Sequence, residues 1–289
     1  MTTASLAGLL EEAFEVRQAN FSKEIEFVYP QNTLPLRSTG ENCLLNCSHC
    51  GGHYLKGMKP LEEAWQKEGE GKKSFLLSGS CDKEGQVPHL KRWEEIKLLS
   101  SRGSLNFHSG LVGEKEAEKI GSLASVVSFD FIVDQETIDN VYGLGVSPQR
   151  YISSYRYLKK YVKVVPHLCI GLNKGEIKGE YKALETLKEE GAEALSFIVF
   201  RPTKNTDFAK FPPPPLEEVA KLIAKARTMF PTSPIYLGCM RPGGRYRGEL
   251  DTLALRAGVN KIVHPSPPAR KMAEELGLVV RRGEECCSL

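Results

Sequence analysis

Residues 162–200 read VKVVPHLCIGLNKGEIKGEYKALETLKEEGAEALSFIVF. The stretch begins and ends with apolar runs, at 162–170 and 194–200, of the length and composition of buried strands. Between them, Leu184 and Leu187 lead into Gly191, which is the pattern of a helix followed by a stop signal. A strand, a helix and a second strand in this order predict a βαβ unit with parallel strands.

The same alternation extends outward through most of the chain. Apolar runs predict further strands at 36–38, 75–77, 105–107, 126–132, 235–237 and 261–263. Helical segments lie between them, such as 216–229 after a run of prolines, and a helix opened by Ser266 and Pro267 that closes near Gly277. Because eight strands alternate with helices, we predict an α/β fold, a complete or nearly complete (βα)8 TIM-type barrel, over a two-domain Rossmann arrangement.

The barrel is expected to be flanked by a short segment at each end. An amphipathic helix precedes it, with Leu6, Leu9, Leu10, Ala13 and Phe14 on one face. We therefore expect an N-terminal helical extension at 1–35, the barrel at 36–280 and a tail at 281–289. No linker or repeat divides the barrel.

The composition sets limits on the class of protein. Of the 289 residues, 41% are hydrophobic and 26% charged, which excludes disorder, collagen-like repeats and coiled coil. No apolar run approaches the ~18 residues of a membrane span, and Met1 to Leu10 lacks a basic segment ahead of an apolar one. The net charge of +3 indicates no nucleic-acid footprint. We expect a cytoplasmic protein with neither a nucleic-acid nor a membrane partner.

The cysteines carry most of the chemical information. Without a secretion signal, eight of them are better read as metal ligands or reactive thiols than as a disulfide framework. Cys43, Cys47 and Cys50 follow the spacing C-x3-C-x2-C. Three thiolates on one loop can hold three corners of a cubane iron–sulfur cluster and leave the fourth iron open. A zinc site with His49 or His53 as fourth ligand is the alternative.

This loop, with His49 directly before the last cysteine, resembles the signature of the radical S-adenosylmethionine (SAM) enzymes. The resemblance implies that Cys43, Cys47 and Cys50 hold a 4Fe–4S cluster whose open iron binds SAM. One electron from that cluster then cleaves SAM to methionine and a 5′-deoxyadenosyl radical, which abstracts a hydrogen atom from the substrate. His49 takes the place of the ring whose backbone lies near the adenine.

Two loops resemble further SAM-binding positions of the family. Ser78 and Gly79 open the run Ser-Gly-Ser-Cys-Asp after a predicted strand, where family members bind the SAM amino group. Gly171 opens a glycine-containing stretch similar to the adenine-binding one. Glycines that merely serve turns are the simpler interpretation.

Two charged residues at predicted strand ends are further candidates. The Asp130 carboxylate is suited to accept a hydrogen bond from a ribose or substrate hydroxyl, and Arg201 to hold a carboxylate through two hydrogen bonds. The alternatives stay open: a solvated Asp130 beside a helix-capping Asp134, and an ordinary surface arginine.

Four other cysteines form a hypothetical second iron–sulfur site. Cys81 and Cys239 follow the strands at 75–77 and 235–237, so both are expected at the barrel mouth. A tail folded over the mouth would add Cys286 and Cys287 as the remaining ligands. Cys169 is held in reserve as a further candidate. A buried inert thiol is the alternative for Cys169, and also for Cys81.

Across most of its length the sequence resembles the biotin-synthase-like branch, and within it the two-protein (class II) lipoyl synthases. The motifs that carry this resemblance are residues 43–55, 78–82 and 236–242 and the closing Glu285-Cys286-Cys287. It implies sulfur insertion into an octanoyl chain on a lipoyl-carrier protein, with a second, related radical SAM subunit, a low-potential electron donor and a sacrificial auxiliary cluster. The C-x4-C-x5-C motif of single-protein lipoyl synthases is absent from the sequence.

Three other functions remain open. Biotin synthase-like sulfur insertion is one: Cys169 echoes a biotin-synthase ligand, although Tyr236 stands where that enzyme has an arginine. A one-cluster enzyme of the hydrogenase-maturation or carbon-skeleton-rearrangement type is the second. A non-catalytic iron–sulfur scaffold or electron carrier is the third.

Overall fold

The computed structural model describes residues 5–289. Residues 1–4, which begin both the expected N-terminal extension and the segment Met1 to Leu10, lie outside the described residues. The chain forms two compact units, each built from separate stretches of sequence. Unit 1 comprises Met1–Tyr29, His167–Pro202 and Phe211–Gly283, and unit 2 comprises Pro30–Pro166, Thr203–Lys210 and Glu284–Leu289.

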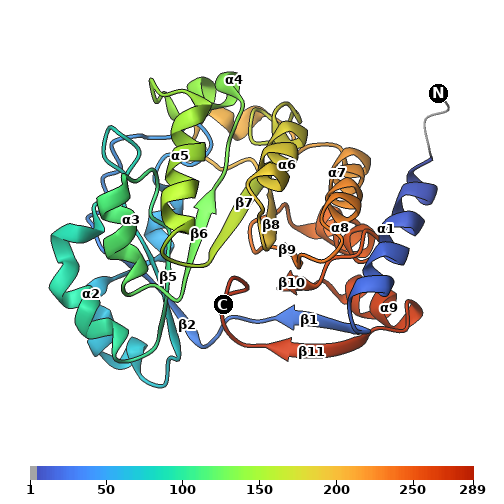
Figure 1. Cartoon of the computed structure of the whole chain (residues 1–289), viewed down its shortest axis with the longest axis horizontal. Helices are drawn as coiled ribbons and strands as arrows, with labels where there is room; N and C mark the ends of the chain where they lie inside the picture. The colour runs from blue at the N-terminus through green and yellow to red at the C-terminus, as the bar shows by residue number, and fades with distance from the viewer. Residues whose placement is uncertain (1–4) are drawn as a thin grey trace. The chain divides into compact units, whose positions relative to one another are not determined.

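Unit 1 is a parallel sheet with helices packed beside it. Its strand order is β11-β1-β10-β9-β8-β7, and every strand pair recorded in this unit is parallel. Helix α1 packs on α7 and α8, which Figure 1 shows beside strands β8 to β10. The elements are α1 (Leu6–Asn20), β1 (Glu24–Val28), β7 (Val164–Ile170, whose first three residues belong to unit 2), α6 (Glu180–Glu189), β8 (Leu195–Val199), α7 (Leu216–Met229), β9 (Ile235–Leu237), α8 (Gly244–Arg256), β10 (Lys261–Val263), α9 (Pro267–Glu275) and β11 (Val279–Gly283).

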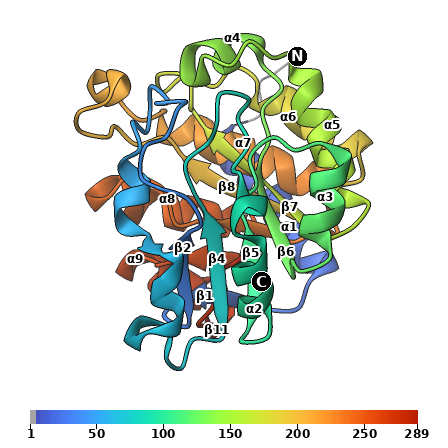
Figure 2. The ribbon, with the colours of Figure 1, turned by 90° about the vertical axis from the view of Figure 1, so that its left-hand side faces the viewer.

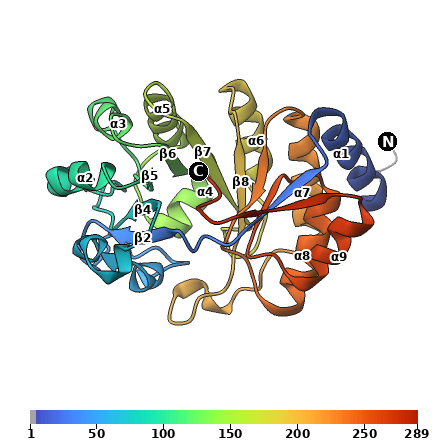
Figure 3. The same cartoon turned by 90° about the horizontal axis from the view of Figure 1, so that it is seen from below.

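Unit 2 repeats this architecture with the strand order β6-β5-β4-β2-β3, and its strands lie side by side in Figure 2. In Figure 3, helices α2, α3 and α5 line one face of strands β4, β5 and β6. The strands are β2 (Thr33–Arg37), β3 (Lys59–Pro60), β4 (Ser74–Ser78), β5 (Ser104–Phe107) and β6 (Val126–Asp130). The helices are η1 (His53–Gly57), η2 (Leu61–Trp65), η3 (Lys67–Gly69), η4 (His89–Arg92), α2 (Trp93–Ser100), α3 (Glu114–Gly121), α4 (Gln135–Thr137), η5 (Ile138–Tyr142), α5 (Pro148–Lys159) and η6 (Asp207–Lys210).

The two faces of the unit 2 sheet differ in chemistry, because successive side chains of a strand point to opposite faces. One face is apolar and buried, with Leu34, Leu36, Phe75, Leu77, Leu105, Phe107, Val127 and Phe129. The other carries a buried polar layer of Thr33, Ser74, Asn106 and Ser128. A buried polar layer needs hydrogen-bond partners.

The tail at 284–289 provides those partners. The Cys286 backbone N–H donates to Thr33 Oγ1 at 2.8 Å, and Asn106 Nδ2 donates to Cys286 Sγ at 3.2 Å. Ser128 Oγ donates to Ser288 Oγ at 2.9 Å. Residues 286–288 are thus held against the polar face of the unit 2 sheet.

All eight predicted strands are present, with ends shifted by a few residues. The complete barrel is not shown: the strand order ends at β11 on one side and at β3 on the other, and these two edge strands do not pair in the part of the chain that the structure describes. Strands β1, β3 and β11 were not predicted from the sequence. Strand β1 lies inside the segment 1–35, which was expected to be a helical extension. It shows no continuous apolar run, because Glu24 and Glu26 alternate with the buried Ile25 and Phe27.

Among the helices that the structure describes, none has the length and hydropathy that a membrane span requires.

Candidate functional site

The three-cysteine loop follows β2 and turns tightly. The backbone N–H groups of Cys50 and Gly51 both donate to the Cys47 carbonyl, at 2.9 and 2.8 Å. Asn46, Gly51 and Gly52 have φ of 42°, 51° and 73°, a left-handed conformation that glycine adopts without strain. Local turn chemistry therefore gathers the three cysteines on one loop.

Backbone N–H groups surround two of the three sulfurs. The Cys43 sulfur accepts from the N–H groups of Leu45, Asn46 and Cys81, and the Cys50 sulfur from those of Gly52, His53 and Tyr54. A hydrogen bond from the Cys81 thiol is the main reason that the pKa of Cys43 falls to about 5. Burial, followed by repulsion from Cys50 and Cys43, raises the pKa of Cys47 to about 12.

This donor set fits an iron–sulfur cluster. Hydrogen bonds to the sulfurs are one of the means by which proteins tune such clusters. The N–H groups favour the thiolate at both sulfurs, although burial outweighs them at Cys50 and raises its pKa. Within residues 5–289, no three His, Cys, Asp or Glu side chains lie close enough to bind one metal ion together. Three thiols on one loop are a ligand set that an iron–sulfur cluster can use.

Asp130 and Tyr151 lie beside these thiols. Asp130 ends β6 and reaches solvent, but protein atoms surround its carboxyl group and raise its pKa to about 6. Burial raises the pKa of Tyr151, and repulsion from Asp130, Cys47 and Cys81 adds to this effect. The Asp130 carboxyl group, the Tyr151 phenol and the loop thiols are therefore close enough to influence one another electrostatically.

The half-buried His49 ring sits against the edge of Tyr142, with ring centroids 5.9 Å apart. Its Nδ1 atom is buried with no hydrogen-bond partner in the part of the chain that the structure describes. The loop is anchored at the neighbouring residue, because the Ser48 N–H and Oγ donate to the carbonyls of Val141 and Asn140 at 2.8 and 2.9 Å. A buried ring nitrogen without a partner is a group that a ligand can satisfy.

The run from Ser78 to Asp82 is fastened to the segment ahead of the loop. The Ser80 N–H donates to Thr39 Oγ1 at 2.6 Å, and the Ser80 hydroxyl to the Gly40 carbonyl. A Cβ on Gly79 would lie 2.4 Å from Thr39 Oγ1, so this position has room only for glycine. Cys81 consequently sits beside Cys43.

The tail cysteines lie at another level of the sheet. Cys286 contacts Asn106, which pairs with Val126 at the start of β6. Cys81 interacts electrostatically with Asp130, which lies four residues later at the end of β6. Four residues of strand span about 13 Å. A hydrogen bond from the Cys287 thiol is the main reason that the pKa of Cys286 falls to about 6, and Cys287 itself is buried.

Other candidates lie in unit 1, where Cys169 is half-buried on β7 and pairs with Ile198 of β8. The Gly171 N–H donates to Glu180 Oε1 at 2.7 Å, and a Cβ on Gly171 would lie 2.7 Å from Pro214 Cγ. The close approach of the Pro214 ring therefore explains why this position is a glycine. In unit 2, Asp134 caps α4 by accepting from the Thr137 N–H at 2.8 Å.

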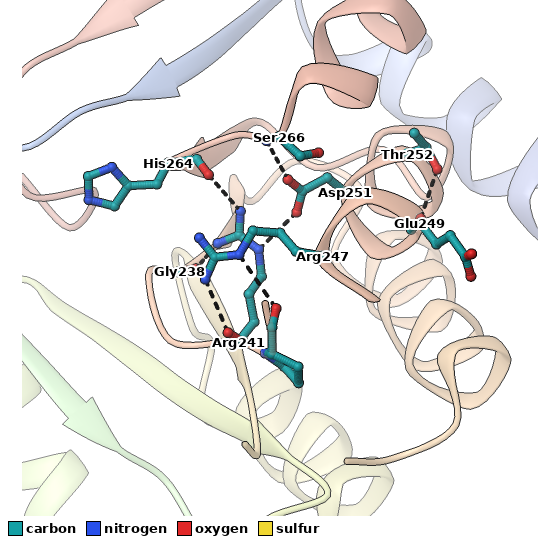
Figure 4. A network of polar contacts seen from close by, with 9 residues as sticks. Gly238, Arg241, Arg247, Glu249, Asp251, Thr252, His264 and Ser266 are labelled. Carbon is teal, nitrogen blue, oxygen red and sulfur yellow. Dashed lines mark hydrogen bonds and ion pairs between the residues drawn. The ribbon is translucent and has the colours of Figure 1, made fainter. Parts of the chain in front are cut away.

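The exposed Cys239 follows β9 in unit 1 beside a buried ion pair, shown in Figure 4. Arg241 Nε donates to Asp251 Oδ1 at 2.8 Å, and neither side chain is exposed. The same guanidinium donates to the carbonyls of Gly238 and His264. Arg241 thereby fixes the chain after β9 to the chain after β10.

A second cation lies next to this pair. Arg247 Nη2 donates to the Arg241 carbonyl at 3.1 Å. Burial and repulsion from Arg241 lower the pKa of Arg247, and Arg201 adds to the repulsion. Arg201, Arg247 and Cys239 thus share one electrostatic environment in unit 1.

No sequence pattern pointed to Tyr142, Tyr151, Arg241 or Arg247 as site residues. Tyr151 lies on α5 at helical spacing from Ser154 and Tyr155, which are also buried, so its pattern is that of an ordinary core position. Arg241 and Asp251 are ten residues apart, and no short motif connects them.

Comparisons with known proteins identify the fold. No family model matches the sequence, and no curated protein matches it either. Among solved structures, methylornithine synthase (PylB) is similar with a TM-score of 0.69 and 17% identity, over 97% of this chain and 91% of that one. The FeFe-hydrogenase maturase HydG from Carboxydothermus hydrogenoformans is similar with a TM-score of 0.71 and 16% identity, over 96% and 73%. At these identities the likeness establishes a shared fold.

Proposed function

We propose that this chain is a radical SAM enzyme. The observation that carries the proposal is the single loop on which Cys43, Cys47 and Cys50 lie, with N–H groups directed at the Cys43 and Cys50 sulfurs. The fold shared with methylornithine synthase and HydG supports it, because the same loop would then lie on a scaffold used by enzymes. The exposed Asp130 and the buried Tyr151 beside the loop would offer polar groups to a substrate.

The residues divide into a cluster-binding and a ligand-binding set. Cys43, Cys47 and Cys50 would hold a 4Fe–4S cluster, which when bound supplies the electron for cleaving SAM. His49 would offer its buried Nδ1 to the cofactor. Asp130 would accept a hydrogen bond from a ribose or substrate hydroxyl. Ser78 and Gly79, and in unit 1 Gly171 and Arg201, stay proposed contacts for the amino, adenine and carboxylate groups of SAM.

The finer proposal is sulfur insertion, with this chain as one subunit of a two-component lipoyl synthase. It rests on the resemblance of the loop and the Cys286-Cys287 tail to that group. Its substrate would be an octanoylated lipoyl-carrier protein, and its partners a second radical SAM subunit and a low-potential electron donor. The sacrificial second cluster would use Cys81, Cys239, Cys286 and Cys287, with Cys169 in reserve. Since Cys286 is bonded to Asn106, that cluster requires the tail to leave the polar layer.

A one-cluster radical SAM enzyme is the second candidate. The observation that favours it is the separation of the thiols of unit 2: Cys81 lies beside Cys43, while Cys286 lies beside Asn106. Hydrogenase maturation and carbon-skeleton rearrangement are the reaction types to test first, since the similar structures include a hydrogenase maturase and methylornithine synthase. Biotin synthase-like sulfur insertion and a non-catalytic scaffold are the remaining alternatives.

Anaerobic reconstitution tests these proposals together. The wild type and a Cys43/Cys47/Cys50→Ala triple variant are assayed for iron, acid-labile sulfide and 5′-deoxyadenosine after addition of SAM and dithionite. Two clusters predict about eight irons in the wild type and about four in the variant, whereas one cluster predicts about four and none. Iron without 5′-deoxyadenosine in the wild type would refute the radical SAM proposal and favour the scaffold.

A further inference from the structure

The thiols of Cys43 and Cys81 face each other across two loops that are far apart in sequence. We propose that Cys81 is the disulfide partner of Cys43 in the cluster-free protein, so that the chain carries a reversible oxidation site at its cluster-binding loop. The pairing goes beyond the proposed function, because it requires neither SAM nor a second cluster.

Three contacts bring the two residues together. The Cys81 thiol and the Cys81 backbone N–H both donate to the Cys43 sulfur. In the opposite direction, the Leu44 N–H donates to the Cys81 carbonyl at 3.0 Å. These reciprocal bonds hold the two backbones side by side at the cysteines, as a disulfide requires.

Both sides of the pair are held in place. On the Cys81 side, Asp82 Oδ1 accepts from the N–H groups of Glu84 and Gln86, each at 3.0 Å, which closes the turn that follows. Ser80, directly before Cys81, is bonded to Thr39 and Gly40. Because neighbours of each cysteine are bonded to one another, the two thiols stay close while the loop between Cys43 and Cys50 is empty.

The loop offers a competing pair that sequence alone would favour. Cys47 and Cys50 form a C-x2-C motif, the spacing of dithiol redox sites. In the structure the Cys50 sulfur is occupied by the N–H groups of Gly52, His53 and Tyr54. Only the Cys43 sulfur accepts a hydrogen bond from another thiol among the described residues of this loop.

The chemistry is thiol–disulfide exchange with a low-molecular-weight disulfide such as glutathione disulfide. The Cys43 thiolate attacks one sulfur of glutathione disulfide, forming a mixed disulfide and releasing one glutathione thiolate. The Cys81 thiol then loses its proton and attacks the Cys43 sulfur, which releases the second glutathione. The protein pair loses two electrons and two protons, and one glutathione disulfide becomes two glutathiones.

The disulfide would protect Cys43 from further oxidation and would also prevent the cysteine loop from binding a cluster. Tied to Cys81, the Cys43 sulfur cannot bind iron, but it is also kept from oxidation beyond the disulfide, and a thiol reductant restores it. Both cysteines are partly exposed, so a small oxidant and a reductant can reach them.

The experiment uses the full chain, stripped of iron and equilibrated anaerobically with glutathione disulfide. Free thiols are alkylated and peptides are mapped by mass spectrometry. We expect a cross-linked peptide pair containing Cys43 and Cys81, about 2 Da lighter than the two reduced peptides together. Iron uptake on reconstitution should be lost after oxidation and restored by dithiothreitol.

Two variants make the result decisive. Cys81→Ala should leave Cys43 glutathionylated, while the matched control Cys169→Ala should retain the cross-link. Circular dichroism of both variants, with Cys81→Ser as a second substitution, separates loss of the partner from loss of the fold. A dominant Cys47–Cys50 or Cys43–Cys47 disulfide in the wild type would overturn the proposal. Absence of 5′-deoxyadenosine in the activity assay would instead count against the proposed function alone.

Discussion

Replacing Asp251 by Asn tests whether the buried ion pair of unit 1 controls its stability. Asp251 accepts from Arg241 Nε through Oδ1 and from the Ser266 N–H through Oδ2, each at 2.8 Å (Figure 4). An amide in its place removes the charge and turns a donor toward one of these two donors. Because Arg241 is fully buried, its charge would remain uncompensated. Breaking a buried pair in this way costs about 3–5 kcal/mol.

The matched control lies on the same helix. Glu249 pairs with Arg245, whose side chain is 93% exposed, and Glu249→Gln should therefore cost no more than about 1 kcal/mol. Urea unfolding followed by circular dichroism compares both variants with the wild type. In thermal unfolding, the loss in Asp251→Asn corresponds to about 10 °C for a chain of this size. Equal unfolding midpoints for the two variants would refute the reasoning.

Three further predictions concern unit 2. His89 is buried between Ser38 and the His108 carbonyl, and burial lowers its pKa to about 4 from the ordinary 6.5. As the pH falls, the unfolded chain binds a proton at this histidine before the folded chain does, so the free energy of unfolding should decrease by about 3 kcal/mol between about pH 6.5 and pH 4. His89→Gln should remove that part of the pH dependence of the urea unfolding midpoint. Gly79→Ala places a Cβ 2.4 Å from Thr39 Oγ1, so it should destabilise the folded protein by about 1–3 kcal/mol and lower the iron bound per chain after reconstitution. The control Gly57→Ala, which has open space around the added Cβ, should change neither quantity. Asn106→Ala removes a donor to the Cys286 sulfur and should raise the pKa of that thiol, seen as a pH profile of Cys286 alkylation that moves to higher pH. An unchanged profile would count against the described position of the tail.

Local signals made much of the fold predictable. Apolar runs located all eight expected strands, and the helix predicted at 216–229 has the observed bounds Leu216–Met229. Hydrophobic periodicity and helix end signals act within a few residues, and they are therefore readable without a structure. The spacing of Cys43, Cys47 and Cys50 indicated a loop site for the same reason.

The rest depends on contacts between distant residues. Strand β1 forms because its backbone pairs with β10 and β11, more than two hundred residues later. Cys81 lies beside Cys43 because Ser80 and Gly79 pack on Thr39, a contact that no spacing rule describes. The closed barrel was expected from a strand count, but a count says nothing about whether the edge strands pair.

The hydrogen bonds of the tail determine when unit 2 can finish packing during synthesis. Asn106 and Ser128 meet their partners Cys286 and Ser288 across sequence separations of 180 and 160 residues. At ribosomal rates of about 5–20 residues per second, those partners emerge roughly 10–40 s after the strands that need them. Until then the polar layer of unit 2 must stay hydrated, so unit 2 completes its interior only after residues 286–288 have been synthesised. A nascent chain stalled before residue 284 should therefore hold unit 2 in an open, protease-sensitive form.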